Sequence, residues 1–422
     1  MTRAKKYFCA VPVVAAAMFG GSLLAHAAPD TSVVVTTLYS YTGASGAGPD
    51  GGMIIDPSGV LYGVTYGGGA MNQGAVYQLV PPATAGGAWT ENTLYSFTGG
   101  NDGGTPFGAL SLDAQGNVYG STIYGGASNS GTVFELIRPA TTGAAWTEIV
   151  LYSFAGLTDG GNPNGSLIFN PTGRLYGTAP NGGSASSGVI FQLSPPSTTG
   201  APWTYSVLYN FQGGSSGATP STGVIFGLGN ALYGCTYAGG TSNAGTVYQL
   251  TPPPSGTGPW TQSVLYSFTG GKDGGYPDSG LITGVAGALY GVTPYGGTGY
   301  GTVYQITPPQ TGSTWTESAL YDFKGTPAKD GENPYGSLLL ISHDVLLGTT
   351  YGGGSGNGTL YSLAPPTQTG GAWTETILYE FTKSTNGSNP YAGVVAGPGN
   401  LVFGTTFYGG KKHQGVVFSA TP

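Results

Sequence analysis

Acid–base catalysis and metal binding need titratable side chains that lie close together, and this chain offers few of them. Only 7% of its 422 residues are charged. Beyond the first 27 residues there are two histidines, His343 and His413, and one cysteine, Cys235. None of them has the His-x-x-x-His or Cys-x-x-Cys spacing of a zinc site. We therefore predict no metal and no other cofactor, and a lone cysteine predicts a small buried strand residue.

Most of the acidic residues recur at equivalent places, which favours a structural role. Glutamate stands two residues after a tryptophan at Glu91, Glu148, Glu317 and Glu375, and Asp-Gly-x-x-Pro begins at Asp102, Asp159, Asp273 and Asp330. Such Gly-rich acidic loops could hold Ca²⁺ through carboxylate and carbonyl oxygens. Other copies use Ser45, Ser216 or Asn386 there, and no loop has a second acid at regular spacing. The preferred interpretation is a turn, and no catalytic residue is predicted.

Two phrases recur along the whole chain and define the elements that position these residues. A Trp-Thr phrase that leads into Leu-Tyr-x-Phe starts at Trp89, Trp146, Trp203, Trp260, Trp315 and Trp373, with a trimmed copy at Trp315. Gly-x-Val-(Tyr/Phe) or a near variant starts at Gly74, Gly131, Gly188, Gly245, Gly301, Gly358 and Gly415, in steps of 56 or 57 residues. The chain is seven copies of one unit.

Each copy reads as an antiparallel meander of four strands of five to nine residues. In the second copy the expected strands are 107–112, 117–123, 132–137 and 146–154, separated by Gly, Asn and Pro turns. Their apolar residues fall on both faces, which is typical of a sheet covered on both sides. Seven such sheets predict an all-β fold, a seven-bladed β-propeller, with an open β array as the alternative.

The ends of the repeat region favour a closed ring. The first strand, 32–41, is of the fourth type and has no three strands before it, and the last, 416–420, is of the third type and lacks a successor. An open array would leave both with unpaired edges. Placing 32–41 beside 416–420 completes the seventh blade, so the N-terminal strand is predicted to close the ring.

The first 27 residues have the composition of a secretory leader. Arg3, Lys5 and Lys6 precede an apolar run, and Ala25-His26-Ala27 is a small-x-small cleavage site. We predict a signal peptide at 1–27 and a propeller at 28–422, secreted or periplasmic, without a membrane span once the leader is removed. The mature chain would carry eight basic and 18 acidic residues, a net charge of −10. That charge argues against nucleic acid as a partner, and a monomer is expected.

The repeated phrases also support a family. Leu-Tyr-x-Phe, Asp-Gly-x-x-Pro, Leu-Tyr-Gly-x-Thr, a Gly-Gly loop and Gly-x-Val-(Tyr/Phe) together resemble the GloVer tandem-repeat family of secreted bacterial proteins, over residues 32–422. The resemblance implies no established activity and no catalytic residues. Members of that family often carry a cell-surface anchor after the repeats, and no such segment follows here, so release rather than attachment is expected.

Seven residues that follow the loop prolines are predicted to ring the mouth of the central channel. Their neighbours hardly vary, but this position holds two acids, an amide, a hydroxyl and three aromatic rings: Asp50, Phe107, Asn164, Ser221, Asp278, Tyr335 and Tyr391. Asp50 enters the set with a register adjustment of one residue. Mixed polar and aromatic groups on one axis are typical of ligand pockets, and a water-filled channel is the alternative.

A second candidate surface consists of tyrosines in the Gly-Gly loops, which should project from the same face as the Asp-Gly-x-x-Pro loops. They are Tyr66, Tyr124, Tyr237, Tyr295, Tyr351 and Tyr408. Tyrosine among Gly, Ser and Asn is typical of recognition surfaces and would suit sugars. Packing against the neighbouring blade is the alternative.

These features favour a secreted, non-catalytic binding protein for a glycan or cell-wall polymer. A structural or surface-interaction protein without a small ligand is the first alternative. A hydrolase or lyase that acts on polysaccharide with two carboxylates is the second.

Overall fold

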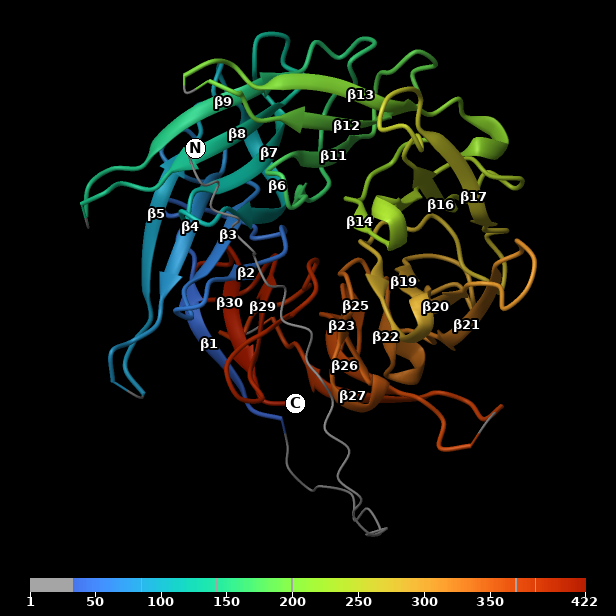
Figure 1. Cartoon of the computed structure of the whole chain (residues 1–422). Coiled ribbons are helices and arrows are strands. Elements are labelled where there is room, and N and C mark those ends of the chain that lie inside the picture. Colours follow the sequence, from blue (N-terminus) through green and yellow to red (C-terminus); the bar gives the residue numbers. More distant parts are fainter. Residues whose placement is uncertain (1–32, 85, 142, 199, 369, 384) are drawn as a thin grey trace, which may run out of the picture. The chain divides into compact units, whose positions relative to one another are not determined.

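The computed structural model describes residues 33–84, 86–141, 143–198, 200–368, 370–383 and 385–422, and their strands form seven four-stranded sheets. Figure 1 shows these sheets as blades around a common centre, with the first strand of each blade innermost and the last outermost. Neighbouring strands within every blade are antiparallel. The fold is a seven-bladed β-propeller, as the repeats predict. The expected leader, 1–27, lies outside the described residues.

The first four blades follow the chain in order. Blade 1 contains β2 (Ile54–Ile55), β3 (Leu61–Thr65), β4 (Ala75–Val80) and β5 (Thr90–Ser96). Blade 2 contains β6 (Gly104–Leu112), β7 (Val118–Tyr124), β8 (Thr132–Ile137) and β9 (Thr147–Ser153). Blade 3 contains β10 (Ile168–Phe169), β11 (Leu175–Ala179), β12 (Val189–Ser194) and β13 (Thr204–Asn210). Blade 4 contains β14 (Ile225–Phe226), β15 (Leu232–Thr236), β16 (Thr246–Thr251) and β17 (Thr261–Ser267).

The remaining blades add a small ladder and complete the ring. Blade 5 contains β18 (Ile282–Thr283), β19 (Leu289–Thr293), β20 (Thr302–Thr307) and β21 (Thr316–Asp322). Blade 6 contains β23 (Leu339–Leu340), β24 (Leu346–Thr350), β26 (Thr359–Ala364) and β27 (Thr374–Glu380), and its loops pair through β22 (Gly331–Glu332) and β25 (Gly352–Gly353). Blade 7 contains β28 (Val395–Ala396), β29 (Val402–Thr406), β30 (Val416–Ala420) and β1 (Val35–Ser40). Short 3-10 turns are η1 (Gly214–Ser216), η2 (Leu228–Asn230), η3 (Val285–Gly287), η4 (Thr326–Ala328) and η5 (Ser342–Asp344).

The core lies between the blades rather than within any one of them. The second and third strands carry the most buried residues, and β11 is buried along its whole length. The last residue of Leu-Tyr-x-Phe packs edge-on against the third strand of the next blade, as in Phe154 against Phe191, whose ring centroids are 5.4 Å apart. Both rings are fully buried. A blade that shares its aromatic core with both neighbours is stable only in a ring or a stack.

The N-terminal strand closes the ring, as predicted. β1 pairs with β30 from Val35 opposite Ala420 to Ser40 opposite Val416, and Figure 1 shows the blue and red strands side by side. This pair has a register shift between its third and fifth residues, and every other pair of third and fourth strands also has one. Tyr41 then takes the place of the buried phenylalanine and contacts Tyr77 of blade 1 at 5.3 Å.

The tryptophans connect each blade to the one before it. Trp203 of blade 3 lies 6.1 Å from Tyr119 of blade 2, and Trp89 of blade 1 lies 5.6 Å from Phe403 of blade 7. These indole rings are half-buried. The tryptophans therefore pack between neighbouring blades at the outer strands, the same role in each case, as their equivalent positions in the repeat indicate.

The expected length of the innermost strands is wrong. Only β6 has nine residues, and in the other six blades the first strand has two. The chain before those two residues lies close both to the neighbouring blade and to its own second strand: a Cβ on Gly165 would be 2.6 Å from the backbone nitrogen of Gly223 and 2.7 Å from the Thr178 hydroxyl of β11. Close backbone approach of this kind requires glycine.

Candidate functional site at the centre of the propeller

All seven predicted mouth residues line a single central cavity of about 620 Å³. Each blade contributes one of them, immediately after its loop proline. The proline sets the register, because its ring contacts the glycine that begins the third-strand phrase of the preceding blade. Pro163 contacts Gly131 in this way, and Pro49 contacts Gly415 in the same way, with 2.5 Å from its Cδ to a Cβ built on that glycine. The adjustment that places Asp50 in the set is therefore confirmed.

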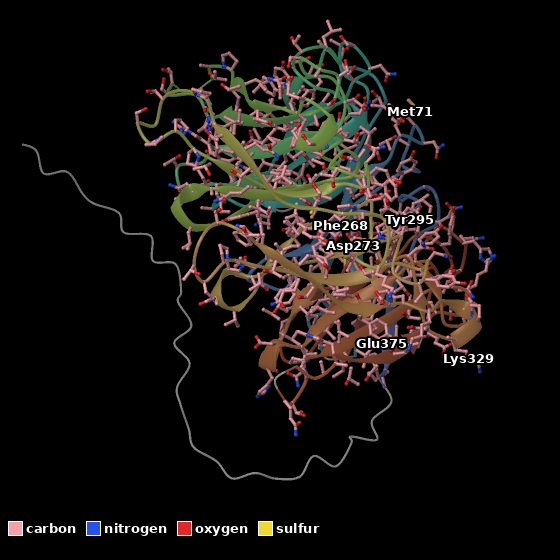
Figure 2. All side chains as sticks on the ribbon, turned by 90° about the vertical axis from the view of Figure 1, so that its right-hand side faces the viewer. Met71, Phe268, Asp273, Tyr295, Lys329 and Glu375 are labelled. Carbon is pink, nitrogen blue, oxygen red and sulfur yellow. The ribbon has the colours of Figure 1, made fainter. Side chains whose placement is uncertain are left out.

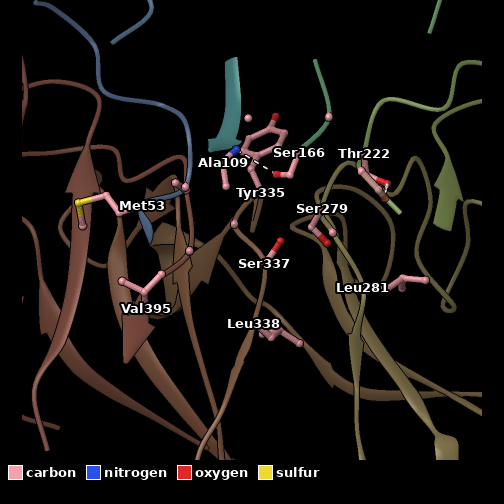
Figure 3. A pocket seen from close by; sticks show the side chains of 18 of the residues that line it. Met53, Ala109, Ser166, Thr222, Ser279, Leu281, Tyr335, Ser337, Leu338 and Val395 are labelled. Atoms are coloured by element: carbon pink, nitrogen blue, oxygen red, sulfur yellow. Dashed lines mark hydrogen bonds between the residues drawn. The ribbon is translucent and has the colours of Figure 1, made fainter. Parts of the chain in front are cut away.

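The side chains along the cavity change in character with depth. Two residues beyond the mouth ring, small residues leave the interior open: Gly52, Ala109, Ser166, Gly223, Gly280, Ser337 and Gly393. Two residues further, aliphatic side chains line the far end: Ile54, Ile168, Ile225, Leu339 and Val395. Figure 3 shows Tyr335 above Ser337, with a hydrogen bond of 2.9 Å from the Ala109 N–H to the Ser166 hydroxyl beside them. The cavity thus has a polar and aromatic mouth, an open middle and an apolar far end.

Four aromatic rings form one cluster at the mouth. Tyr335 and Tyr391 stack with centroids 4.8 Å apart and planes at 12°. Phe107 meets Tyr391 edge-on at 6.0 Å, and Tyr351 from a Gly-Gly loop contacts both tyrosines edge-on. The Tyr391 hydroxyl lies 3.5 Å from Oδ2 of Asp278. Because Tyr391 starts on blade 7 and reaches residues of blades 2 and 5, its side chain lies across the opening.

The other groups at the mouth are polar and incompletely hydrogen-bonded. Asp50 is 4% exposed, and within the described residues its Oδ1 has no hydrogen-bond partner, nor does the buried Oδ1 of Asn164. Burial raises the pKa of Asp50 well above its usual range, against the lowering effect of the backbone N–H groups of Asp50 and Gly51. Burial likewise raises the pKa of Asp278 to about 6, although the Tyr391 hydroxyl favours its charged form. The described cavity lining contains no lysine, arginine or histidine.

The Gly-Gly loops and the Asp-Gly-x-x-Pro loops lie on one face, as predicted. Isolated bridges join the two kinds of loop in the same repeat, as between Gly161 and Asn181. Figure 2 shows Met71, Tyr295 and Lys329, which belong to such loops, toward one side of the molecule. The mouth residues belong to this face because Tyr295 and Tyr335 bring their hydroxyls within 3.2 Å of each other.

The six loop tyrosines divide into exposed and half-buried positions. Tyr66, Tyr124, Tyr295 and Tyr408 are 40–46% exposed, while Tyr237 and Tyr351 are half-buried. On blade 7 and blade 1, Phe407 contacts both Tyr408 and Tyr66. Tyr66 and Tyr408 thus pack on Phe407 and still present part of their surface to solvent.

Sequence reasoning missed Tyr276, which joins the loop tyrosines of blades 4 and 5. Its ring is 5.3 Å from Tyr237 and 6.0 Å from Tyr295, so the three form an arc that leads to Tyr335 at the mouth. Its backbone has φ of 59°, the left-handed region, where the equivalent residues are glycine, asparagine or threonine. A bulky residue there is an unfavourable exception, and such exceptions gather at functional sites. The bulky residue at this position, where the other repeats have glycine, asparagine or threonine, was the signal in the sequence that could have pointed to Tyr276.

The loop aspartates take part in turns, and Asp102, Asp273 and Asp330 each lie near a glutamate on the fourth strand of the same blade. Asp102 accepts hydrogen bonds from the Thr98 N–H at 2.8 Å and the Tyr95 hydroxyl at 3.1 Å. The pKa of Glu148 on β9 is raised to about 7, mainly by burial and in addition by the negative charge of the nearby Asp102. Glu317 and Glu375 show the same effect beside their own loop aspartates. A search along each loop could not find this second acid, since it lies some 45 residues away in sequence.

Two further residue types have simple roles. Cys235 is fully buried in β15, and burial raises the pKa of its thiol to about 12, as expected of an inert strand residue. In the described part of the chain, no helix has the length and apolar character that crossing a lipid bilayer requires.

Three solved structures are similar to the chain at low identity. A putative oxidoreductase (glucose dehydrogenase) from Thermus thermophilus is 14% identical with a TM-score of 0.41, over 92% of this chain and 99% of its own. A protein of unknown function from Dyadobacter fermentans is 13% identical with a TM-score of 0.43, over 82% and 97%. An ulvan lyase of polysaccharide lyase family 25 is 11% identical with a TM-score of 0.47, over 90% and 94%. No curated protein matches the chain.

A family model settles the classification of the repeats. The model of the Gloeobacter/Verrucomicrobia repeat matches residues 19–225 and again residues 197–418. The two matches together span nearly all of the seven blades. The chain belongs to the Gloeobacter/Verrucomicrobia repeat family.

Proposed function

We propose that the protein binds a carbohydrate polymer on the loop face, with the channel mouth as the main site. The observation that carries this proposal is the central cavity, whose mouth combines a cluster of four aromatic rings with the polar side chains of Asp50, Asn164 and Asp278. Aromatic faces pack against the apolar faces of sugar rings, and carboxyl and amide oxygens accept hydrogen bonds from sugar hydroxyls. A cavity of several hundred Å³ with few polar groups is the usual form of a ligand site.

The arc of tyrosines supports a polymer rather than a single sugar. Tyr237, Tyr276 and Tyr295 continue from the mouth across blades 4 and 5, and Tyr295 meets Tyr335. Consecutive rings on one surface offer contact area to consecutive sugar units at a low entropy cost. We also propose secretion, on the basis of the N-terminal sequence, which would bring the protein to such polymers.

The test is a glycan array followed by affinity measurements on the oligosaccharides that bind. The double variant Asp278→Ala with Tyr335→Ala should lower affinity at least tenfold, because it removes one hydrogen-bond acceptor and one stacking face from the mouth. The matched control is Asp344→Ala with Leu228→Ala, since both residues are exposed on hairpins between first and second strands, outside the Gly-Gly and Asp-Gly-x-x-Pro loops. Unchanged affinity in a normally folded double variant would remove the mouth as the site.

A polysaccharide-cleaving enzyme is the second candidate. Asp278 has a pKa of about 6, raised by burial, and lies next to the Tyr391 hydroxyl, so it could exchange a proton near neutral pH. The same oligosaccharides, incubated with the protein and analysed for shorter or unsaturated products, distinguish the two functions. Intact oligosaccharides at catalytic and at stoichiometric protein concentrations support binding alone.

A further inference from the structure

The charge at the mouth restricts which ligands it can hold. Asp50 and Asp278 are the ionisable carboxyl groups of the cavity, and the described lining includes no basic side chain. Uronates and sulfated sugars would bring further negative charge to buried carboxylates, which is unfavourable in a site of low dielectric constant. The mouth therefore favours neutral or positively charged ligands.

The side chains that surround the two carboxyl groups do not change the net charge of the mouth. Tyr391, Tyr66 and Tyr77 lie near Asp50. Tyr391, Tyr335, Tyr237 and Cys235 lie near Asp278. Phenols and thiols are neutral below about pH 8. Charge at the mouth thus comes from the two carboxyl groups and is zero or negative throughout the physiological range.

The aromatic cluster favours a cation over a neutral group. The four rings of the mouth cluster are connected through Tyr391, which contacts Tyr335, Tyr351 and Phe107. Tyr335 also contacts Tyr351, and the hydroxyl group of Tyr391 lies beside Asp278. Aromatic faces attract ammonium groups through the negative potential of the ring face, and groups of such rings are a recurrent means of recognising organic cations. A positively charged ligand also needs no basic residue of the protein to bind it, which agrees with the composition of the cavity lining.

Asp50 supplies an independent observation. It is 4% exposed, it lines the cavity, and its Oδ1 has no hydrogen-bond partner within the described residues. A buried carboxyl group in that condition is costly unless something pairs with it. An ammonium group in the cavity would offset this cost by its positive charge.

We infer that the channel mouth binds an organic ammonium group, carried by an amino-sugar unit of a polymer or by a small free cation. The inference rests on the proposed function in taking the mouth as the ligand site. It adds that the carboxyl groups of Asp50 and Asp278 recognise positive charge, with the aromatic rings as the remaining walls.

The experiment compares three probes by isothermal titration calorimetry: a tetramer of β-1,4-linked glucosamine, its fully N-acetylated counterpart, and choline. At pH 6 the glucosamine tetramer should bind at least tenfold more tightly than the acetylated one. Because burial raises the pKa of Asp278 to about 6, ammonium binding at that pH should release about half a proton from this group. Titrations in two buffers of different ionisation heat measure this release, and its sign distinguishes a cation from a neutral ligand.

Asp278→Asn should lower affinity for the glucosamine tetramer at least tenfold and abolish the part of the proton release that comes from Asp278, while affinity for the acetylated tetramer stays within twofold. Asp344→Asn is the matched control, because it removes the same charge from an exposed hairpin of blade 6, away from the cavity lining. Raising the pH from 5 to 6 should strengthen binding of the amine to the native protein as Asp278 ionises, and should do so by less in the Asp278→Asn variant.

The outcomes separate the two proposals. Equal affinity for both tetramers, lost in the mouth variants, overturns ammonium recognition and leaves carbohydrate binding in place. Binding of choline without either tetramer supports ammonium recognition and removes the polymer as ligand. Binding of none of the three probes, or binding without proton release, overturns the inference.

Discussion

Asp50 is a buried carboxyl group at a repeat position where most other blades have an uncharged residue, and its burial lowers the stability of the protein once it ionises. Its carboxyl group is buried at the mouth, and burial raises its pKa well above the usual range. A group whose pKa is raised by folding stabilises the protein fully below its unfolded pKa of about 4, and this contribution is lost as the pH rises through the folded value. Ionised Asp50 should therefore destabilise the native protein at alkaline pH.

We expect Asp50→Asn to be more stable than the native protein at pH 8, because burial raises the pKa of Asp50 well above its usual range. The two should be nearly equal at pH 3.5. Denaturant unfolding at several pH values measures the difference. Asp56→Asn, in the same blade, is the control of opposite sign: hydrogen bonds from Ser58 and Val60 outweigh burial and lower the pKa of Asp56. That variant should be less stable at pH 7 and should converge with the native protein as the pH falls.

At the scale of elements, the outer strand of each blade is held by a tryptophan that packs on the preceding blade. Trp203 before β13 contacts Tyr119 of β7 and belongs to the core shared by blades 2 and 3. Because the indole is only half-buried, Trp203→Ala should cost about 2 kcal/mol, less than the ~3–5 kcal/mol of a fully buried tryptophan. Chemical denaturation measures the loss.

Leu157→Ala provides the comparison, since Leu157 is 71% exposed on a loop of the same region and its truncation should change stability by less than about 0.5 kcal/mol. A Trp203→Ala protein as stable as the Leu157→Ala protein would mean that the tryptophans do not join the blades. The repeated contact of Trp89 with Phe403 indicates that the same cost applies at the other interfaces.

At the scale of the whole molecule, stability depends on ring closure by β1. Removing residues 33–41 would leave the edge of β30 unpaired and would take away Tyr41, which is fully buried between blades 7 and 1. An exposed strand edge promotes aggregation. We expect the truncated protein to aggregate or to melt at least about 10 °C lower, measured by circular dichroism and light scattering.

Removal of Thr421 and Pro422, which are exposed after β30, is the corresponding control and should leave the melting temperature unchanged. A soluble, monomeric 33–41 deletion with native melting would contradict the role of β1 as the closing strand.

The sequence by itself determined the architecture, because seven copies of one phrase require seven equivalent units. It placed the third strand of blade 2 at Thr132–Ile137 and assigned the N-terminal strand to blade 7. It also predicted that Asp50, Asn164, Tyr335 and the other mouth residues share one cavity, since equivalent positions in a symmetric ring must converge on its axis. Because the repeats are equivalent, the position of a residue within its repeat predicts its position in the ring.

Only the tertiary structure decided what symmetry leaves open, namely how unequal side chains at equivalent positions meet. Tyr391 of blade 7 lies across the mouth to Asp278 of blade 5, 113 positions earlier in the sequence. Tyr276, which departs from the repeat, joins Tyr237 of the preceding blade to Tyr295 of its own. The equivalent first strands have two residues in β10 and nine in β6, a difference that the shared phrase does not predict. Such contacts depend on ring reach, burial and local electrostatics, and these arise only when the seven blades pack together.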